Sequence, residues 1–166
     1  MWVHPFKNHN NIKLPLLDLI SKIPKTIIKE KGDTISHSDF YLPKTLDRKY
    51  LDYFYQNIND HMSMLCEVFN SREWSIKSGW FQQYTQGNSH NYHNHGESQF
   101  AGVYYLELPN KSMTTEFLDG SKVEAKEGDI IIFPSYKYHR SKKNTSQKRK
   151  TVIAFNCSFN ICNFIK

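Results

Sequence analysis

Histidines are concentrated in one short segment of the chain, which reads His90-Asn91-Tyr92-His93-Asn94-His95. Neutral imidazole is the commonest metal ligand in proteins, so the spacing of these side chains can be compared with metal geometry. On an extended strand alternate residues share a face, so His93 and His95 point to one side while His90, an odd number of positions away, faces the other. His139 follows later as a third donor. Three donors on one side of an ion leave its other side open, which is the arrangement of a catalytic metal site.

The surroundings of His139 predict how this third donor is held. Gly128-Asp129 favours a turn into Ile130–Phe133, a run typical of a buried strand, and Pro134 then ends the strand shortly before His139. The ligand would therefore lie at a strand entry beside a rigid turn. The remaining histidines are expected to be ordinary surface or core residues, and they are His4, His9, His37 and His61.

The elements that must position these side chains begin with a helical first half. Residues 1–40 predict irregular structure with a short helix at Leu16–Ser21, because Pro24 discourages a longer one. Apolar residues then recur at three- and four-residue intervals after Thr45, a candidate N-cap, and predict an amphipathic helix over about 45–70. From Trp74 onward, short aromatic and β-branched runs predict strands at 74–77, 79–85, 90–95, 101–107, 114–118, 121–124, 129–133, 137–141 and 149–159.

A helix followed by many antiparallel strands predicts a mainly β fold, a barrel or sandwich with helical backing. The chain has 166 residues, of which 39% are hydrophobic, and this suffices for one core. We therefore expect a single domain over residues 1–166. Its parts would be a helical N-terminal support in 1–73 and a core of strands in 74–160.

Composition also limits where the protein works. The apolar stretch Leu14–Ile20 is short and broken by Pro15 and Asp18, so it is neither a signal peptide nor a membrane span. The three cysteines are an odd number without a C-x-x-C pair, which favours a reducing compartment and a cytoplasmic protein; they are Cys66, Cys157 and Cys162.

The formal net charge of +6 is compatible with an acidic partner. The basic residues are concentrated late, at Lys137, Arg140, Lys142, Lys143, Lys148, Arg149 and Lys150. Such a run usually belongs to a solvated loop. Nucleic-acid binding is kept as an alternative that rests on this stretch alone.

The second half of the chain, roughly residues 74–159, resembles the 2-oxoglutarate- and Fe(II)-dependent oxygenases, and within them the small enzymes of bacteria and phages. The resemblance is carried by Trp80–Tyr84, His93–His95, Gly102–Leu106, Glu127–Pro134, His139 and Ile153–Asn156. It implies a double-stranded β-helix, which is a jelly-roll of the cupin type. It also implies Fe(II), 2-oxoglutarate as cosubstrate, and dioxygen. The expected activity couples oxidative decarboxylation of 2-oxoglutarate to hydroxylation of a small molecule, a protein side chain or a nucleobase, in a bacterial cell or in the host cell of a phage.

The resemblance also implies roles for individual residues. Several members of the superfamily place a tyrosine, then a glycine, then the first iron-binding histidine at the spacing of Tyr84, Gly87 and His93. His95 and His139 would complete the iron site. Tyr84 would lie at the cosubstrate.

A basic residue about ten positions after the distal histidine pairs in this family with the far carboxylate of 2-oxoglutarate, often with Ser or Thr two positions later. Arg149 and Thr151 reproduce this pattern, and a guanidinium binds a carboxylate through two parallel hydrogen bonds. Lys150 is the alternative if the spacing after His139 is longer by one residue. Arg149 would then be only one of the basic residues in the stretch 137–150. Matching Val103–Leu106 to the family suggests Tyr105 as a further cosubstrate contact, with ordinary packing as the alternative.

The sequence departs from the superfamily at position 95, where Asp or Glu is usual and this chain has His. The iron site would be His93, His95 and His139, with one negative charge fewer. Two alternatives stay open, in which Glu97 supplies a carboxylate or His95 and Glu97 are the pair with His93 behind them. We favour His93 and His95.

The cupins are the strongest rival family. Their spacing is also met, by Gly87, His93, His95, Gly128, Pro134 and His139. A cupin's fourth ligand, a glutamate, would fall on Gln99 or Phe100, and the cupin pattern does not require Arg149. The alternative function is therefore a cupin-type metal-binding module or metalloenzyme that does not use 2-oxoglutarate, and both families share the expected fold.

Overall fold

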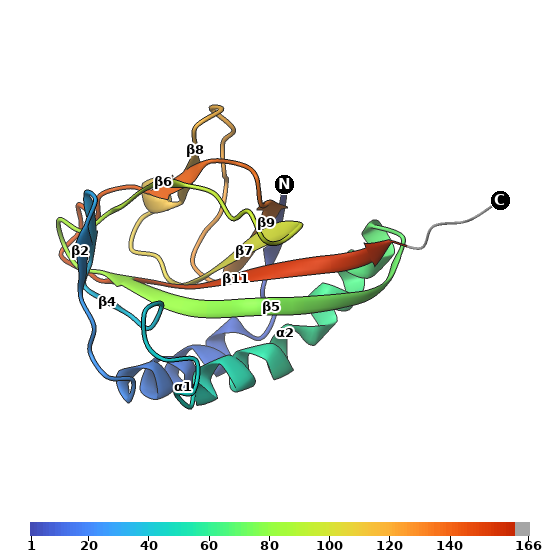
Figure 1. The fold of residues 1–166 in the computed structure, drawn as a ribbon, viewed down its shortest axis with the longest axis horizontal. Helices are drawn as coiled ribbons and strands as arrows, with labels where there is room; N and C mark the ends of the chain where they lie inside the picture. The colour runs from blue at the N-terminus through green and yellow to red at the C-terminus, as the bar shows by residue number, and fades with distance from the viewer. Residues whose placement is uncertain (162–166) are drawn as a thin grey trace.

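The structure, a computed structural model, describes residues 1–161. They form three layers, with one large antiparallel sheet between a layer of helices and a smaller sheet (Figure 1). The strand order of this sheet is β1-β9-β7-β11-β5-β4. Its strands are β1 (Trp2–Pro5), β4 (His37–Ser38), β5 (Ser71–Tyr84), β7 (Phe100–Glu107), β9 (Asp129–Pro134) and β11 (Lys150–Ile161). A smaller sheet, ordered β6-β10-β8, contains β6 (His90–His93), β8 (Thr115–Phe117) and β10 (His139–Ser141).

Two helices cover the face of the large sheet that lies away from the small one, as Figure 1 shows; they are α1 (His9–Ser21) and α2 (Lys49–Val68). A separate hairpin of β2 (Ile28–Glu30) and β3 (Asp33–Ile35) and a short 3-10 helix, η1 (Lys111–Met113), complete the elements. Facing antiparallel sheets backed by helices confirm the predicted mainly β fold class.

Alternation along the strands of the large sheet divides the core into two clusters. On β7, Tyr104 and Leu106 pack with the helices, whereas Val103 and Tyr105 pack between the sheets. The same parity holds on β9, where Ile130 and Ile132 join the helical cluster and their neighbours join the inner one. A residue's position in a strand therefore decides whether its side chain reaches the space between the sheets.

Several elements differ from the predicted ones. The predicted helix over 45–70 is observed as α2, but α1 starts earlier than predicted and contains Pro15. Burial of Ile12, Leu16 and Ile20 along one stripe outweighs the cost of that proline. The strands predicted at 74–77 and 79–85 are one strand, β5, and residues 121–124 form no strand. Residues 1–73 are not only helical, because β1 and β4 join the large sheet.

A buried ion pair holds the loop between β4 and α2. Oδ2 of Asp39 accepts hydrogen bonds from Nε of Arg48 at 2.8 Å and from the hydroxyl of Tyr50 at 2.7 Å. Oδ1 of Asp39 accepts from the backbone N–H of Phe81 on β5 at 3.0 Å. Because both carboxylate oxygens are engaged, this loop is fixed to the helix and to the sheet.

The remaining expectations concern single residues and the membrane. Cys66 and Cys157 are buried free thiols, and Cys162 lies outside the residues described. Neither helix within residues 1–161 has the length and apolar character needed to cross a membrane.

Candidate metal centre

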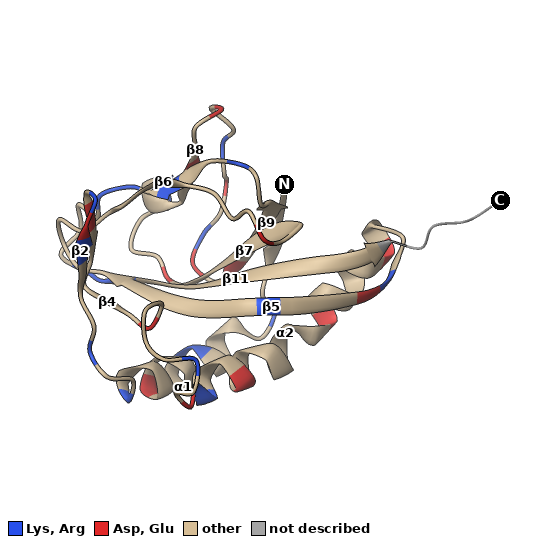
Figure 2. Ribbon diagram, viewed as in Figure 1, with Lys and Arg blue, Asp and Glu red and all other residues tan. Residues whose placement is uncertain are grey.

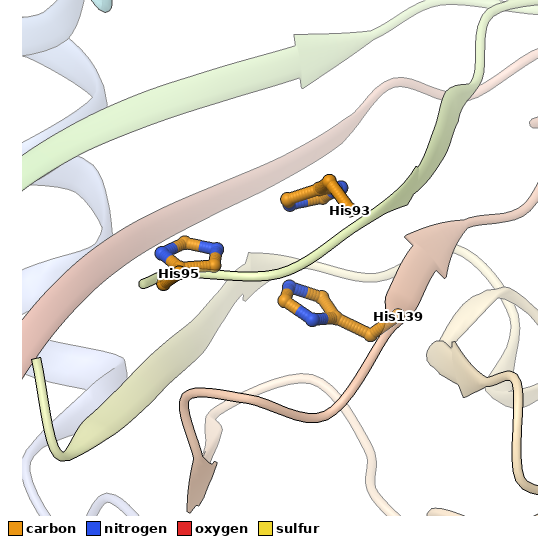
Figure 3. A group of neighbouring side chains, drawn as sticks. All are labelled: His93, His95 and His139. Carbon is orange, nitrogen blue, oxygen red and sulfur yellow. The ribbon is translucent and has the colours of Figure 1, made fainter. Parts of the chain in front are cut away.

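The three histidines selected from the sequence converge between the two sheets. The ligand atoms of His93, His95 and His139 all lie within 4.8 Å of one another, and their rings point toward a common space (Figure 3). His93 on β6 pairs with His139 on β10 across the small sheet. His95 lies beyond the end of β6, and its backbone N–H donates to the carbonyl of Ser135 at 2.9 Å. The predicted strand 90–95 is thus shorter than expected, yet its two ligand candidates share a side.

Each of these rings has one nitrogen held by an oxygen of the protein. The Nδ1 atoms lie 2.8 Å from the carbonyl of Asn91 for His93, and 2.9 Å from the carbonyl of Lys137 for His139. For His95, Nδ1 lies 2.7 Å from the side-chain oxygen of Asn156. Partners of this kind place the proton on Nδ1 and leave Nε2 as the free lone pair, as in metal-bound histidines.

The electrostatics of the cluster favour neutral rings. Burial is the largest cause that lowers the pKa of His139 to about 3 and that of His95 to about 4, and it also lowers the pKa of His93. Nε2 of His95 is buried and has no hydrogen-bond partner within residues 1–161. Neutral, converging imidazoles with an unpaired buried nitrogen fit a divalent transition metal, because such ions prefer this donor.

The expectation that His90 faces away from the other histidines is wrong. His93 pairs with His139 and His90 pairs with Ser141, so β6 contains one residue more than β10 over this interval. Such a bulge reverses the alternation and turns His90 toward His93, whose ring stacks on it at 4.0 Å between centroids. His90 is still outside the ligand cluster, because both of its ring nitrogens lie near other side chains. Nδ1 of His90 is 3.4 Å from Nε2 of Gln82, and Nε2 of His90 is 3.5 Å from a carboxylate oxygen of Asp33.

Two adjacent cavities share His93 and His95 in their walls. The larger one, of about 500 Å³, opens to the surface beside His93 and His95. The smaller one, of about 30 Å³, lies deeper, between the same histidines, His139 and Lys150. Trp80 and Gln82 belong to the walls of both. Both cavities therefore border on the candidate metal ligands.

Lys150, not Arg149, faces the inner cavity. On β11, Lys150 is paired with Tyr84 across the neighbouring strand, and only 2% of Lys150 is exposed. Its Nζ donates to the carbonyl of Met113 at 2.7 Å and to the hydroxyl of Ser141 at 2.9 Å, both neutral groups. Burial lowers the pKa of Lys150 to about 7.

Arg149 and Thr151 lie outside this cavity. The guanidinium of Arg149 donates to both carboxylate oxygens of Glu107, at 2.8 and 3.1 Å, and the Thr151 hydroxyl donates to the same carboxylate. Strand parity is the reason, because residues adjacent to Lys150 along β11 point to the opposite face. The structure therefore does not bring Arg149 or Thr151 to the histidines, and it places Lys150, the alternative left open by the sequence, there instead.

The two predicted tyrosines lie on the inner face. Nζ of Lys150 is 5.4 Å from the ring centroid of Tyr84 and 5.8 Å from that of Tyr105. The hydroxyl of Tyr84 donates to Gln82 at 2.7 Å, and that of Tyr105 donates to Thr115 at 2.9 Å. Both rings thus form the walls around the lysine.

Three further residues lie near the histidine cluster. Glu97 is exposed in the outer cavity and is not part of the ligand cluster. Trp80 stacks on His95, with the ring centroids 5.6 Å apart. Asn156, quoted above only as part of a motif, orients His95. Its position on β11, six residues after Lys150, was the parity signal that could have identified it.

Most basic residues of the late stretch 137–150 form ion pairs with acidic side chains of the same chain. Lys137 pairs with Asp119, Arg140 and Lys142 pair with Glu116, and Arg149 pairs with Glu107. Acidic and basic residues are accordingly interspersed around β8 (Figure 2). Since Lys150 is buried, few charges of this run face solvent unpaired, and the stretch gives little support to a nucleic-acid surface.

The chain resembles known proteins in structure rather than in sequence. No family model and no curated protein matches the sequence. Among solved structures, the viral collagen prolyl hydroxylase vCPH from Paramecium Bursaria Chlorella virus-1, in its 2OG complex, matches with a TM-score of 0.62 and 14% identity, over 95% of this chain and 96% of that one. HygX from Streptomyces hygroscopicus, with nickel and 2-oxoglutarate bound, matches with a TM-score of 0.68 and 10% identity, over 93% of this chain and 81% of that one.

The chain has the fold of the 2-oxoglutarate oxygenases. A further structure of this fold is the non-heme alpha ketoglutarate dependent epimerase SnoN from nogalamycin biosynthesis, with a TM-score of 0.68, 10% identity, and coverage of 93% of this chain and 76% of that one. At these identities the likeness is one of fold. The predicted double-stranded β-helix is confirmed, and the residues of the site must carry the functional argument.

Proposed function

We propose that this protein is an Fe(II)- and 2-oxoglutarate-dependent dioxygenase in which His93, His95 and His139 bind the metal and Lys150 binds the far carboxylate of 2-oxoglutarate. The observation that carries the proposal is the buried ammonium of Lys150, which lines the same inner cavity as the histidines and contacts only neutral oxygens. An uncompensated buried charge is costly, and an anionic ligand would remove that cost.

The chain's own residues would divide the work as follows. Three neutral imidazoles would hold the ion on one side, each kept in orientation by the oxygen bonded to its Nδ1. Lys150 would anchor the cosubstrate at its far end, between the rings of Tyr84 and Tyr105. Bound Fe(II) would supply the redox chemistry that couples decarboxylation of 2-oxoglutarate to oxidation of the primary substrate by dioxygen.

We propose hydroxylation as the outcome of that oxidation. The far carboxylate of the cosubstrate would lie in the inner cavity beside Lys150, its other end would reach the histidines, and the primary substrate would enter the outer cavity, which reaches the surface. The fold by itself does not select hydroxylation, since SnoN is an epimerase.

Thermal denaturation tests the proposal and separates it from a cupin-type module. A ligand that binds only the native state raises the melting temperature by mass action. We expect Mn(II) to raise it, and 2-oxoglutarate or its inert N-oxalyl analogue to raise it further once metal is present. Lys150→Met should keep the first increment and lose the second, His139→Ala should lose both, and Arg149→Met should keep both. Stabilisation of the wild-type protein by metal without any increment from 2-oxoglutarate would contradict the proposal and favour the cupin-type module.

A further inference from the structure

The walls of the outer cavity favour one chemical class of substrate. Their formally charged side chains are Asp33 and Glu97, and no Lys or Arg lines this cavity within residues 1–161. This composition runs against the chain's net charge of +6. A dianionic 2-oxoglutarate would offset a divalent metal, three neutral histidines add no charge, and the two carboxylates would outweigh the single positive charge of Lys150 in the inner cavity. The carboxylates would therefore determine the sign of the potential that a substrate meets.

Asp33 is held in place to present its charge. Its Oδ1 accepts a hydrogen bond from the backbone N–H of Asn91 at 2.7 Å. Its Oδ2 lies 3.5 Å from Nε2 of His90, a ring that carries a charge only when it is protonated. Because a backbone bond fixes the carboxylate, binding a cation there would require little further ordering.

Aromatic rings form a second wall at the mouth of the cavity. Phe40 and Tyr41 are 50% and 61% exposed, which is unusual for adjacent large aromatic residues. The Phe40 ring lies 5.1 Å from Trp80 and 5.0 Å from Tyr41, both edge-on. The Asp39–Arg48 ion pair immobilises the loop that carries them. Faces of aromatic rings attract cations, and a rigid group of rings does so at little entropic cost.

Two further features of the cavity bear on the ligand that it would take. Ile28 and Ile35 give it an aliphatic side, which suits methylene groups. Trp80, 8% exposed, lines the cavity, and its Nε1 is buried without a hydrogen-bond partner within residues 1–161. This nitrogen faces protein atoms, so Trp80 presents its ring rather than its N–H to the cavity.

We propose that the primary substrate presents an alkyl chain ending in an ammonium or guanidinium group, as in a lysine or arginine side chain, to the wall formed by Phe40, Tyr41, Trp80, Asp33 and Glu97. This inference rests on the proposed function, because it assumes that the outer cavity leads to the reacting atoms. The cation would lie between the aromatic faces and the carboxylates, and the methylene chain would lie against the isoleucines.

The test uses the whole protein loaded with Mn(II) and N-oxalylglycine, and four small probes measured by calorimetry. The probes are Nα-acetyl-lysine N-methylamide, its arginine counterpart, the neutral Nε-acetyl-lysine derivative and the anionic glutamate derivative. We expect the cationic probes to bind about tenfold more tightly than the neutral one, because they alone make cation–π and ion-pair contacts. The Glu97→Gln and Phe40→Leu variants should each reduce this preference, and Asp33→Asn should abolish it. Asp119→Asn, at an exposed acid outside the cavity, should leave the preference unchanged.

The outcomes separate this inference from the proposed function. Binding of N-oxalylglycine to the metal-loaded protein is measured in the same samples by its thermal shift, and its absence would remove the proposed function. If the analogue binds but the neutral or anionic probe binds as tightly as the cationic ones, the inference about the substrate is overturned alone. If Asp33→Asn unfolds, Glu97→Gln decides, because this side chain is exposed and its substitution should not unfold the protein. An unchanged preference in that variant, together with an unchanged preference in Phe40→Leu, would overturn the inference.

Discussion

Two buried charges in this protein have opposite surroundings. Asp39, fully buried, has both oxygens occupied, by Arg48, Tyr50 and the backbone of Phe81. Lys150, 2% exposed, contacts only neutral oxygens and the faces of two tyrosines. A buried charge without a counter-charge should cost several kcal/mol. The two sites therefore differ in where the counter-charge comes from: the protein itself or a bound ligand.

The difference distinguishes a scaffold charge from a binding charge. Asp39 is compensated within the protein, and its network joins a loop, a helix and a strand. Lys150 has no counter-charge within residues 1–161, and it lies in the same cavity as His95, whose buried Nε2 also has no hydrogen-bond partner there. If this is right, substitutions at the first position should affect folding, and substitutions at the second should affect only ligand binding.

The largest effect is expected at Asp39. Asp39→Asn removes the charge but keeps the side-chain volume, and it leaves the half-buried Arg48 without a counter-charge. We expect a loss of about 3–5 kcal/mol in the free energy of unfolding, measured by urea denaturation. Asp47→Asn is the matched control, because its pair with Lys49 is exposed, and it should change stability by ~0.5 kcal/mol or less. Equal small effects in both variants would contradict the scaffold role of Asp39.

Lys150→Met should show the converse behaviour. The substitution removes a buried charge that has no counter-charge in the free protein, so the melting temperature should stay the same or rise. The affinity for 2-oxoglutarate in the presence of Mn(II) should fall on the order of 100-fold, as expected when one member of a buried charge pair is removed. Calorimetric titration measures the affinity, and Arg149→Met is the control with unchanged affinity. A strongly destabilised Lys150→Met with normal 2-oxoglutarate binding would reverse the assignment.

The pH dependence of cosubstrate binding follows from the lowered pKa of Lys150. The free protein carries a lysine whose pKa burial lowers to about 7, and the anion requires its protonated form. The protonated fraction is high at pH 6 and small at pH 8, so the affinity for 2-oxoglutarate should fall about tenfold over this interval. Lys150→Arg should bind with a flatter profile, because arginine stays charged. An affinity that rises with pH in the wild-type protein would contradict this role.

A smaller effect is expected when the Asp39 network loses one of its hydrogen bonds. Tyr50→Phe removes the hydroxyl that donates to Asp39 at 2.7 Å but keeps the buried ring. We expect a loss of about 1 kcal/mol in the free energy of unfolding, with 2-oxoglutarate affinity unchanged. A change in affinity without a change in stability would show that the two charged sites are coupled rather than separate.

The elements that the sequence predicted best are those with strong periodicity. The apolar spacing from Leu46 to Phe69 indicated α2, and the run Ile130–Phe133 indicated β9, because both patterns extend over enough residues to exclude other structures. The start of α1 could not be predicted, since the burial that tolerates Pro15 depends on contacts with α2 and the sheet. No strand forms at 121–124, because the strand preference of so few residues is weaker than the turn preference of the residues around them.

The sequence predicted which residues form the candidate metal site, but it could not predict how the strands that carry them pair. His93, His95 and His139 followed from alternation and spacing, and the structure brings them together. Lys150 and Arg149 are adjacent, so only the pairing of β11 with β5 could show which faces inward. His90 was misplaced because a bulge in β6 is invisible to a simple alternation rule. Phe40 and Tyr41 could not be assigned to the cavity at all, since their loop reaches it only through tertiary contacts of Asp39.

The most direct test of the central claim is an anaerobic titration of the wild-type protein with Fe(II) and 2-oxoglutarate, followed by visible absorption. We predict a weak charge-transfer band that requires both additions. The band should be absent in His139→Ala and should need a far higher 2-oxoglutarate concentration in Lys150→Met, while Arg149→Met should titrate like the wild type. A folded, iron-loaded wild-type protein that develops no band at saturating 2-oxoglutarate would contradict the account.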